Sequence, residues 1–404
     1  MRLFFRCQGW RHCSRKWFLW VFPSLHHSGL APYFVWVYER LLSVRSDKLQ
    51  EEQLVESLIK KWDGESVIIR FDEITGAWII IAVHSTKLGP AIGGTRVKSY
   101  DNFRSALKDA LRLGGGMTYK WAAAGFDAGG GKAVLAVPPE LDPQARDDLL
   151  RRYGSFVKQH GGLFLTGPDM GTTSDDMDII GETGAPYVFG RTAAAGGAGN
   201  PAPYTALGVF TGIQVTVKQL FGDASLAGKR VLIQGVGSVG RELIELLCNA
   251  GCEVLVSDVN NAGILSLGEK HPLHVVSPHD VYDTVCDIFA PCAVGGILRE
   301  ETISRLRCGA VVGAANNQLA EVKDAERLRD RGIPYTPDFI ANSGGAIALV
   351  GMETRGWSGE KAREMIIQSI QKNLLQVFEL ADSKGIDTDE AAKCIAEMRL
   401  APSE

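Results

Sequence analysis

A glycine-rich turn between an apolar strand and a helix constrains the fold of this chain more than any other feature. The apolar run Val231–Gln234 leads into a Gly-x-Gly-x-x-Gly spacing, and a helical pattern, Val239–Ala250, follows it. The first glycine permits a tight bend, the second lets a pyrophosphate reach the backbone, and the third lets helix and strand pack closely. The pattern predicts a Rossmann-type dinucleotide site. Its predicted cofactor contacts are the six residues of the turn, Gly235, Val236, Gly237, Ser238, Val239 and Gly240.

A carboxylate at the end of the next predicted strand supports this interpretation. That strand, Glu253–Ser257, ends at Asp258, which lies where a carboxylate can bond both ribose hydroxyls of NAD. The same carboxylate would repel the 2′-phosphate of NADP, so we expect NAD as the cofactor. A strand-to-helix turn without a ligand is the alternative, and Asp258 makes it the weaker one.

Composition excludes several classes of protein. A chain of 404 residues is long enough for two or three domains, and 45% hydrophobic residues is ordinary for a globular protein. The net charge of −4 gives no reason to expect nucleic-acid binding. The eight cysteines form no Cys-x-x-Cys pair, so we expect neither a metal site nor a disulfide framework. Cys292 could be a nucleophile, but a small buried residue is the favoured interpretation.

The first 38 residues differ from the rest. They contain five basic residues, no acidic residue and four of the eight tryptophans. A transit peptide and upstream sequence read through from an earlier start are the competing interpretations, and we favour the second. A membrane segment is not expected, because the apolar stretch Trp17–Pro23 is far shorter than about 18 residues.

From about residue 47 the chain alternates between predicted strands and helices. The predicted helices are Asp47–Trp62, Ser105–Leu113 (ending at Gly114), Asp142–His160 and Thr205–Phe221, with further helices over residues 357–398. The predicted strands include Val67–Arg70, Trp78–Val83, Lys132–Val137, Leu163–Thr166 and Ala310–Val312. This alternation predicts an α/β fold with largely parallel or mixed sheets.

Two lysines in a glycine-rich stretch are candidate catalytic groups. Lys120 and Lys132 are separated by twelve residues, and glycines and apolar residues flank both. Burial and a second nearby cation lower the pKa of a lysine, which would create a base that works near neutral pH. A phosphate-binding P-loop is excluded, because Phe126 and Ala133 stand where that motif needs a glycine and a serine or threonine. Ordinary surface lysines remain the alternative.

Polar residues near other predicted strand ends point to the same region. Asp169 follows Leu163–Thr166, Asn316 follows Ala310–Val312, and we expect the segment Asn342–Gly345 to have the same strand-end character. Ligands of α/β proteins bind at the carboxyl ends of strands, so these residues favour a single active site. A turn or helix-cap role is an equally good explanation of Asp169 alone.

Several motifs in order resemble the Glu/Leu/Phe/Val dehydrogenase family, and closely its leucine, valine and phenylalanine dehydrogenase branch. Besides the glycine turn, they are Leu88–Arg96 (LGPAIGGTR), Gly116–Lys120 (GMTYK), Gly129–Lys132 (GGGK), Thr166–Thr172 (TGPDMGT), Phe289–Gly296 (FAPCAVGG), Gly313–Ala320 (GAANNQLA) and Tyr335–Ile347 (YTPDFIANSGGAI). The resemblance spans about residues 62–398. It implies a two-domain α/β enzyme: an N-terminal substrate domain, a C-terminal Rossmann NAD-binding domain, and C-terminal helices that return to the first domain. The expected divisions are 1–46 (an atypical extension, disordered or not part of the fold), 47–192, 193–345 and 346–404.

The resemblance also implies roles for particular residues. Lys120 would hold the substrate carboxylate, and Lys132 would activate water as a general base. Asp169 would position the amine and relay protons. Substrate would also contact Gly93, Gly94, Met117 and Asn316, and the nicotinamide would contact Thr205 and Asn316. The implied reaction is hydride transfer from the substrate Cα to NAD, addition of water to the iminium, and release of ammonia and a 2-oxo acid; the reverse is reductive amination.

The preferred amino acid stays open among leucine, valine, isoleucine and phenylalanine. The small Ala346, together with Leu349, is similar to the phenylalanine branch, whereas the bulky Ile92 is similar to the leucine type. A pocket of this kind separates close homologues by only about 1–3 kcal/mol. The alternatives are a non-catalytic NAD-binding regulator and a Rossmann oxidoreductase with another substrate. We expect a cytoplasmic homo-oligomer that binds neither nucleic acid nor membrane.

Overall fold

The computed structural model describes residues 54–401, of which residues 54–61 belong to one unit and residues 62–401 to a second, compact unit. In the first unit, residues 54–61 are helical, in agreement with the end of the predicted helix Asp47–Trp62. The rest of that helix and the predicted extension at 1–46 lie outside the described residues. Over residues 54–401, no helix combines the length and the apolar character that a membrane span requires.

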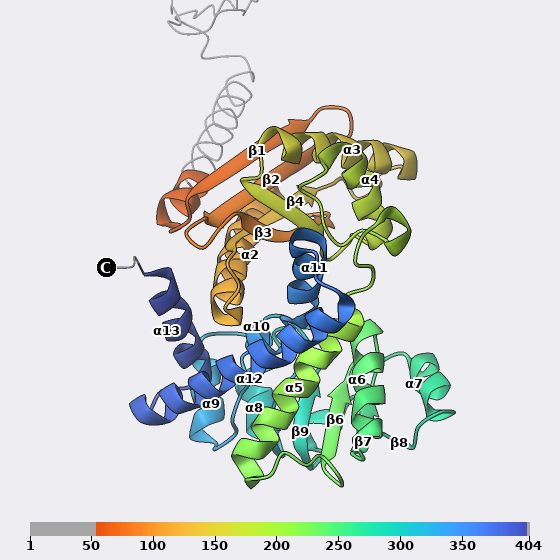
Figure 1. The fold of residues 1–404 in the computed structure, drawn as a ribbon, viewed down its shortest axis with the longest axis vertical. Helices are drawn as coiled ribbons and strands as arrows, with labels where there is room; N and C mark the ends of the chain where they lie inside the picture. The colour runs from red at the N-terminus through yellow and green to blue at the C-terminus, as the bar shows by residue number, and fades with distance from the viewer. Residues whose placement is uncertain (1–53, 402–404) are drawn as a thin grey trace, which may run out of the picture. The chain divides into compact units, whose positions relative to one another are not determined.

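The second unit begins with a mixed five-stranded sheet (Figure 1). Its strands are β1 Ser66–Asp72, β2 Ala77–Ser85, β3 Ala91–Lys98, β4 Gly129–Ala136 and β5 Phe164–Pro168, in the order β1-β2-β4-β3-β5. β2 pairs antiparallel with both β1 and β4, whereas β3 lies parallel to both β4 and β5. The carboxyl ends of β3, β4 and β5 therefore meet at one edge. β3 was not among the predicted strands.

Helices cover both faces of this sheet because its central strands are apolar on both sides. In β2, residues 79–83 are fully buried. The helices are α2 Phe103–Ala124, α3 Pro143–Gln159 and α4 Ser174–Gly184. α3 and α4 pack together, and their buried side chains share a core with β2 and β4. α2 packs along β2 and β4.

The prediction that the helix starting near Ser105 ends at Gly114 is wrong. α2 continues through the three glycines to Ala124 and ends at Gly125, which has a φ of +64°. Close packing explains the difference, because a Cβ at Gly114 would lie 3.3 Å from the Ala82 carbonyl oxygen of β2. Contact with the sheet outweighs the cost of helical glycine, about 1 kcal/mol per residue. Lys120 consequently lies on a helix and not in a loop.

The second sheet has the predicted Rossmann arrangement. Its strands are β6 Arg230–Gln234, β7 Glu253–Ser257, β8 Leu273–Val275, β9 Cys286–Pro291 and β10 Cys308–Val311. All four pairings are parallel, in the order β10-β9-β6-β7-β8, which is the 3-2-1-4-5 order of dinucleotide-binding folds. The accompanying helices are α5 Ala202–Phe221, α6 Ser238–Asn249, α7 Asn261–Gly268, α8 Glu300–Arg305 and α9 Lys323–Asp330.

Four C-terminal helices join the two halves of this unit (Figure 1). They are α10 Asp338–Ala341, α11 Gly344–Arg355, α12 Gly359–Lys384 and α13 Thr388–Leu400. α12 packs mainly on α5, and α13 packs on α2, where Arg399 donates a hydrogen bond to the Ala123 carbonyl at 3.0 Å. The expected return of the C-terminal helices to the first sheet is confirmed. The segment Asn342–Gly345 is not a strand end as predicted, because Asn342 and Ser343 join α10 to α11 and the two glycines begin α11.

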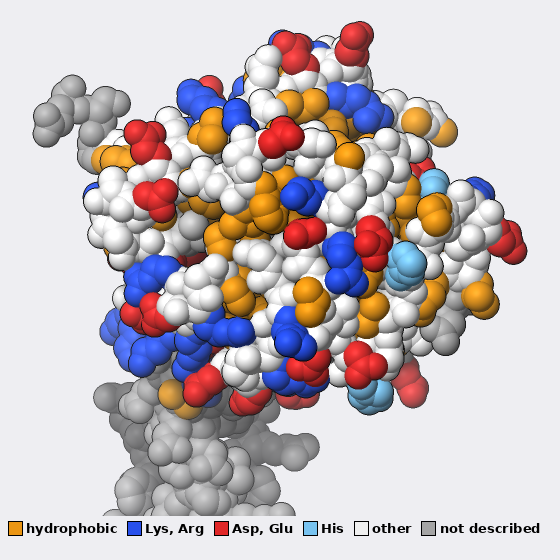
Figure 2. Space-filling model, turned by 90° about the horizontal axis from the view of Figure 1, so that it is seen from below, with side chains coloured by type: hydrophobic (Ala, Val, Ile, Leu, Met, Phe, Trp, Pro, Cys, Tyr) orange, Lys and Arg blue, Asp and Glu red, His pale blue; other side chains and the backbone are white. Residues whose placement is uncertain are grey.

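The charged surface is mixed on the face that Figure 2 shows. Lysine and arginine side chains lie interspersed with aspartate and glutamate, and hydrophobic side chains lie between them.

Candidate active site

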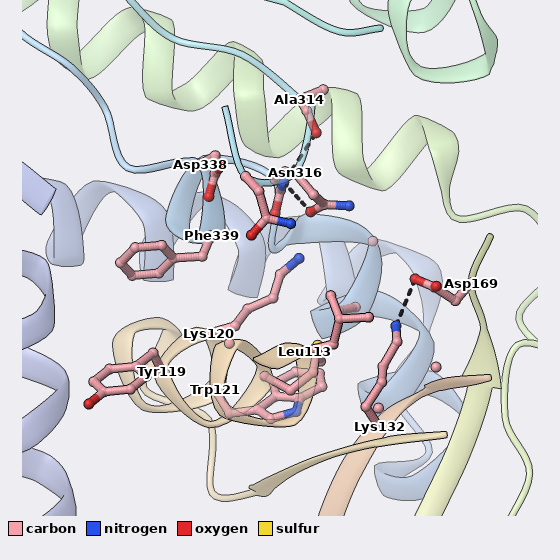
Figure 3. Close-up of a pocket in the computed structure, with 18 of the residues that line it drawn as sticks. Leu113, Tyr119, Lys120, Trp121, Lys132, Asp169, Ala314, Asn316, Asp338 and Phe339 are labelled. Carbon is pink, nitrogen blue, oxygen red and sulfur yellow. Dashed lines mark hydrogen bonds and ion pairs between the residues drawn. The ribbon is translucent and has the colours of Figure 1, made fainter. Parts of the chain in front are cut away.

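One cavity of about 710 Å³ brings together residues from both sheets and from the C-terminal helices (Figure 3). The predicted site residues that line it are Gly93, Gly94, Met117, Lys120, Lys132, Asp169, Thr205, Val239, Asn316, Ala346 and Leu349. These residues are scattered over some 250 positions of the sequence. Their convergence supports the prediction of a single site.

Lys132 and Asp169 form an ion pair between the middle of β4 and the turn that follows β5. Lys132 lies in β4 and is almost fully buried, and its Nζ is 2.7 Å from Oδ1 of Asp169, which follows β5 (Figure 3). Burial lowers the pKa of Lys132, although the Asp169 charge acts in the opposite direction. Burial alone would raise the pKa of Asp169, but Lys132 and Arg96 outweigh it and lower this pKa to about 2. The pair can hold and release a proton in a largely dry environment.

Arg96 holds the Asp169 carboxylate of this ion pair in place through a hydrogen bond. Its Nε donates to Asp169 at 2.9 Å, and its Nη1 donates to Asp109 of α2 at 2.8 Å. Asp109 also accepts hydrogen bonds from Tyr100 and Arg112, at 2.7 and 2.9 Å. Arg96 thus ties the end of β3 to both α2 and the turn after β5. Arg96 lies in the sequence motif Leu88–Arg96, but no role was predicted for it.

Close backbone approach explains the two glycines of β3. A Cβ on Gly93 would clash with the Gly131 carbonyl of β4, and one on Gly94 would lie 2.6 Å from the Pro168 carbonyl oxygen. Any side chain here would push apart the strands that carry Lys132 and Asp169. The glycines keep these strands close and leave bare backbone facing the cavity.

Lys120 reaches into the same cavity from α2 (Figure 3). Burial is the main influence on its ammonium group and lowers its pKa to about 8. Asp338 acts against this shift by attraction, whereas Lys132 adds to it by repulsion. Lys120 has no carboxylate within ion-pair distance among the described residues, so its charge is available to an anionic ligand.

Asp338, at the start of α10, is a site residue that sequence reasoning did not identify. It is 8% exposed, and burial raises its pKa to about 6. Its Oδ2 accepts a hydrogen bond from the Gln318 amide at 2.8 Å, which fixes the loop that carries Asn316. The one available signal was an aspartate inside the Tyr335–Ile347 motif, and a helix-cap role would have explained it equally well.

Amide side chains form the wall of the cavity that faces the second sheet. Asn342 donates to Asn316 Oδ1 at 2.8 Å and to the Ala314 carbonyl at 3.1 Å (Figure 3). The Oδ1 atom of Asn342 is buried without a protein partner. Thr205, near the start of α5, and Val239, from the glycine turn, line the same wall. This wall offers both hydrogen-bond donors and acceptors to a ligand.

The glycine turn has the geometry that its sequence predicted. Gly235 has a φ of +106°, and a Cβ on Gly240 would clash with the Gly235 carbonyl. Gly237 caps α6, and a Cβ there would meet no atom within 4 Å, which leaves space for a phosphate at the helix N-terminus. Apart from Val239, the turn lies outside the cavity walls, as does Asp258.

Asp258 already has backbone partners. Its Oδ2 accepts a hydrogen bond from Val236 N at 2.6 Å, and its Oδ1 accepts one from Asn260 N at 2.7 Å. The carboxylate is therefore held beside the glycine turn, where it retains acceptor capacity for a ligand because each oxygen has two lone pairs.

The positions of Ile92 and Cys292 bear on two further interpretations of the sequence. Ile92 is 4% exposed in a core cluster and does not line the cavity, so its bulk gives no direct information about the substrate. Cys292 is half-buried and not fully buried as predicted, but its surroundings raise the pKa of the thiol to about 12, which keeps it protonated and unreactive.

The Rossmann sheet and the buried lysine–carboxylate pair define an oxidoreductase with a two-domain α/β fold. Comparison with known proteins agrees. Residues 71–185 match the dimerisation domain of Glu/Leu/Phe/Val dehydrogenase, and residues 260–403 match the Glutamate/Leucine/Phenylalanine/Valine dehydrogenase domain. The leucine dehydrogenase of Thermoactinomyces intermedius is 43% identical over 342 residues, which are 85% of this chain and 92% of that protein.

Two further relatives extend the comparison. The phenylalanine dehydrogenase of Lysinibacillus sphaericus is 40% identical, over 87% of this chain and 92% of that protein. The crystal structure of L-tryptophan dehydrogenase from Nostoc punctiforme superimposes with a TM-score of 0.74 and 39% identity, over 85% of this chain and 98% of that chain. The chain therefore belongs to the Glu/Leu/Phe/Val dehydrogenase family. It is an amino acid dehydrogenase, an oxidoreductase that acts on the CH–NH2 group and is NAD(P)-dependent by family.

Proposed function

We propose that this enzyme uses NAD to deaminate an apolar L-amino acid (leucine, valine, isoleucine or phenylalanine) to the 2-oxo acid and ammonia, and that it catalyses the reverse reaction. The observation that carries the proposal is the arrangement of Lys120, Lys132 and Asp169 around one cavity that also contains Thr205 and Asn316. Two cations and one carboxylate match the carboxylate and amino groups of an α-amino acid.

We assign each charged group a role. The available charge of Lys120 would bind the substrate carboxylate, which would in turn raise the pKa of this lysine and keep it charged. Lys132, with its lowered pKa, would take a proton from water that attacks the oxidised substrate. Asp169 would orient Lys132 and accept hydrogen bonds from the amino group. The backbone near Gly93, Gly94 and Met117 would line the space for the substrate.

The residues present fit a dinucleotide. When bound, NAD accepts the hydride that leaves the substrate Cα. The amides of residues 235–240 would hold its pyrophosphate at the N-terminus of α6. Thr205 and Asn316 would bond the carboxamide group. The fixed Asp258 carboxylate would accept hydrogen bonds from the ribose hydroxyls and repel a 2′-phosphate, so we propose NAD and not NADP.

An apolar wall supports the choice of substrate class. Leu113, Met117, Phe189, Ala346 and Leu349 contribute hydrocarbon surface to the cavity. Such a wall stabilises an apolar side chain and leaves a carboxylate side chain without a partner. The small Ala346 leaves room for an aromatic ring.

Neither of the two alternative functions explains the residues of the cavity as well as amino acid oxidation does. A non-catalytic NAD-binding regulator needs only the second sheet and does not require a buried lysine–carboxylate pair. An oxidoreductase for hydroxy acids usually needs a histidine base, and no histidine of residues 54–401 lines this cavity.

Assembly, domain limits and location are part of the proposal. The match to a dimerisation domain supports a homo-oligomer. We propose residues 47–192 as the substrate domain, 193–345 as the NAD-binding domain and 346–404 as the returning helices. A cytoplasmic enzyme that binds neither membrane nor nucleic acid stays a prediction.

A substrate and cofactor panel tests the proposal. NADH formation would be measured with L-leucine, L-valine, L-isoleucine, L-phenylalanine and L-glutamate, each with NAD and with NADP. We expect turnover with at least one apolar amino acid, little with glutamate, and a clear preference for NAD. A preference for glutamate would refute the substrate class, and equal use of NADP would refute the role of Asp258.

The electrostatic attraction between Asp338 and the charge of Lys120 leads to a pH prediction. The Asp338 carboxylate raises the pKa of Lys120, so Asp338→Asn should lower that pKa further. Lys120 is charged below its pKa, so the variant should lose substrate binding at a lower pH. We expect the alkaline limb of the kcat/KM profile to move down by up to about one pH unit. Asparagine can still accept the Gln318 hydrogen bond, and an unmoved alkaline limb would contradict the prediction.

A further inference from the structure

Three consecutive glycines in the middle of α2 need an explanation, because glycine destabilises the interior of a helix relative to alanine. Gly114 is buried against β2, and a Cβ there would lie 3.3 Å from the Ala82 carbonyl oxygen. A Cβ on Gly115 would meet the His84 ring at 3.5 Å, an ordinary contact. Packing therefore explains Gly114, and Gly115 could accept a methyl group.

Gly116 differs from its two neighbours. It is exposed, and a Cβ there would meet no atom of the described structure within 4 Å. Gly116 also lines the cavity, which Gly114 and Gly115 do not. Its φ is not in the left-handed region, so the backbone does not require glycine. Nothing in the protein itself therefore explains the missing side chain.

The cavity does provide an explanation. Leu113, Gly116, Met117 and Lys120 have the i, i+3, i+4, i+7 spacing of one helix face, and all four line the cavity. Figure 3 shows Lys120 extending from this helix toward Asn316. Helical side chains lean toward the N-terminus of their helix, so the side chain of Lys120 extends over the turn that contains Gly116. The absent side chain of Gly116 thus leaves open space in the cavity wall beside the ammonium group of Lys120.

We propose that Gly116 is a positioning residue for the substrate: its missing side chain gives the carboxylate and Cα of the amino acid room to reach Lys120. The amide of Gly116 is engaged inside the helix, so its contribution is space alone. This inference rests on the proposed function, because it assumes that Lys120 binds the substrate carboxylate. It concerns the part that all α-amino acids share, and not the side chain that differs among them.

Gly116→Ala and Gly115→Ala form a matched pair of variants. Both replace a glycine of the same helix with a better helix former, so neither should lower the thermal midpoint of unfolding. We expect Gly116→Ala to raise the KM for the amino acid by about tenfold or more, because a methyl group would overfill the bound state. The KM for NAD should stay unchanged. Gly115→Ala should retain wild-type values for both substrates.

The comparison of substrates tests which part of the amino acid Gly116 accommodates. The KM increase in Gly116→Ala should be similar for L-valine and L-phenylalanine, and Gly116→Leu should give a larger increase for both. Wild-type kinetics in Gly116→Ala would overturn the inference, as would an increase confined to L-phenylalanine. A wild-type enzyme without activity on any amino acid would instead refute the proposed function, so the two failures are distinguishable.

Discussion

Lys132→Ala should lower kcat for oxidative deamination by about 100- to 10,000-fold, the usual contribution of a positioned general base. The ammonium group of Lys132 lies 2.7 Å from Asp169 in an almost fully buried position, and no other lysine in the described residues contacts this carboxylate. NAD binding should persist, because Asp258 and the glycine turn, apart from Val239, lie outside the walls of the cavity that contains Lys132. Steady-state kinetics and calorimetric titration with NAD would measure both effects.

Lys120→Ala provides the contrast for this prediction. Lys120 is assigned to substrate binding, so its loss should mainly raise the KM for the amino acid. A Lys132→Ala enzyme that retains turnover would refute the assignment of Lys132 as the base. A Lys120→Ala enzyme with unchanged KM would refute the assignment of Lys120 to the carboxylate.

Arg96→Ala should lower the free energy of unfolding by about 1–3 kcal/mol, because two largely buried carboxylates, Asp109 and Asp169, would each lose one of their two cations. Arg96 is 14% exposed, and it bridges Asp109 and Asp169 at 2.8 and 2.9 Å. Its loss should also reduce kcat, since Asp169 would no longer be held against Lys132. Denaturant unfolding measures the first effect and steady-state kinetics the second.

Arg152→Ala is the matched control for Arg96. Arg152 also makes two short contacts with one aspartate, Asp72, at 2.7 and 2.8 Å, but it is 31% exposed and lies outside the cavity. We expect a loss of stability of similar size, because the Asp72 carboxylate that remains is buried and loses its one ion-pair partner among the described residues. Its kcat should equal that of the wild type. A full kcat in Arg96→Ala, or a reduced kcat in Arg152→Ala, would contradict the role of Arg96.

The sequence was most informative where one local pattern has one structural solution. The turn at Gly235–Gly240 predicted a strand, a tight bend and a helix, and the φ of Gly235 and the close packing of Gly240 agree. Lys132 and Asp169 were separate predictions with alternatives of comparable weight. Only the fold could show that β4 and β5 bring them to 2.7 Å, because the intervening strand β3 had not been predicted.

The wrongly predicted helix end at Gly114 and the two missed site residues, Asp338 and Arg96, have a common physical cause. The three glycines of α2 carry a local signal for a helix end, but packing of Gly114 against Ala82 outweighs that signal. Asp338 and Arg96 were missed because their importance depends on partners far away in the sequence, namely the Gln318 amide and Asp109 with Asp169. Tertiary contacts of this kind leave no periodic trace in a sequence.

Simultaneous measurement of NADH and ammonia tests the central claim most directly. Purified enzyme would be mixed with NAD and, in turn, L-leucine, L-valine, L-isoleucine and L-phenylalanine. We predict that at least one of these amino acids gives one ammonia for each NADH, together with the corresponding 2-oxo acid. NAD binding without NADH formation from any of the four, or NADH formation without ammonia, would contradict the account.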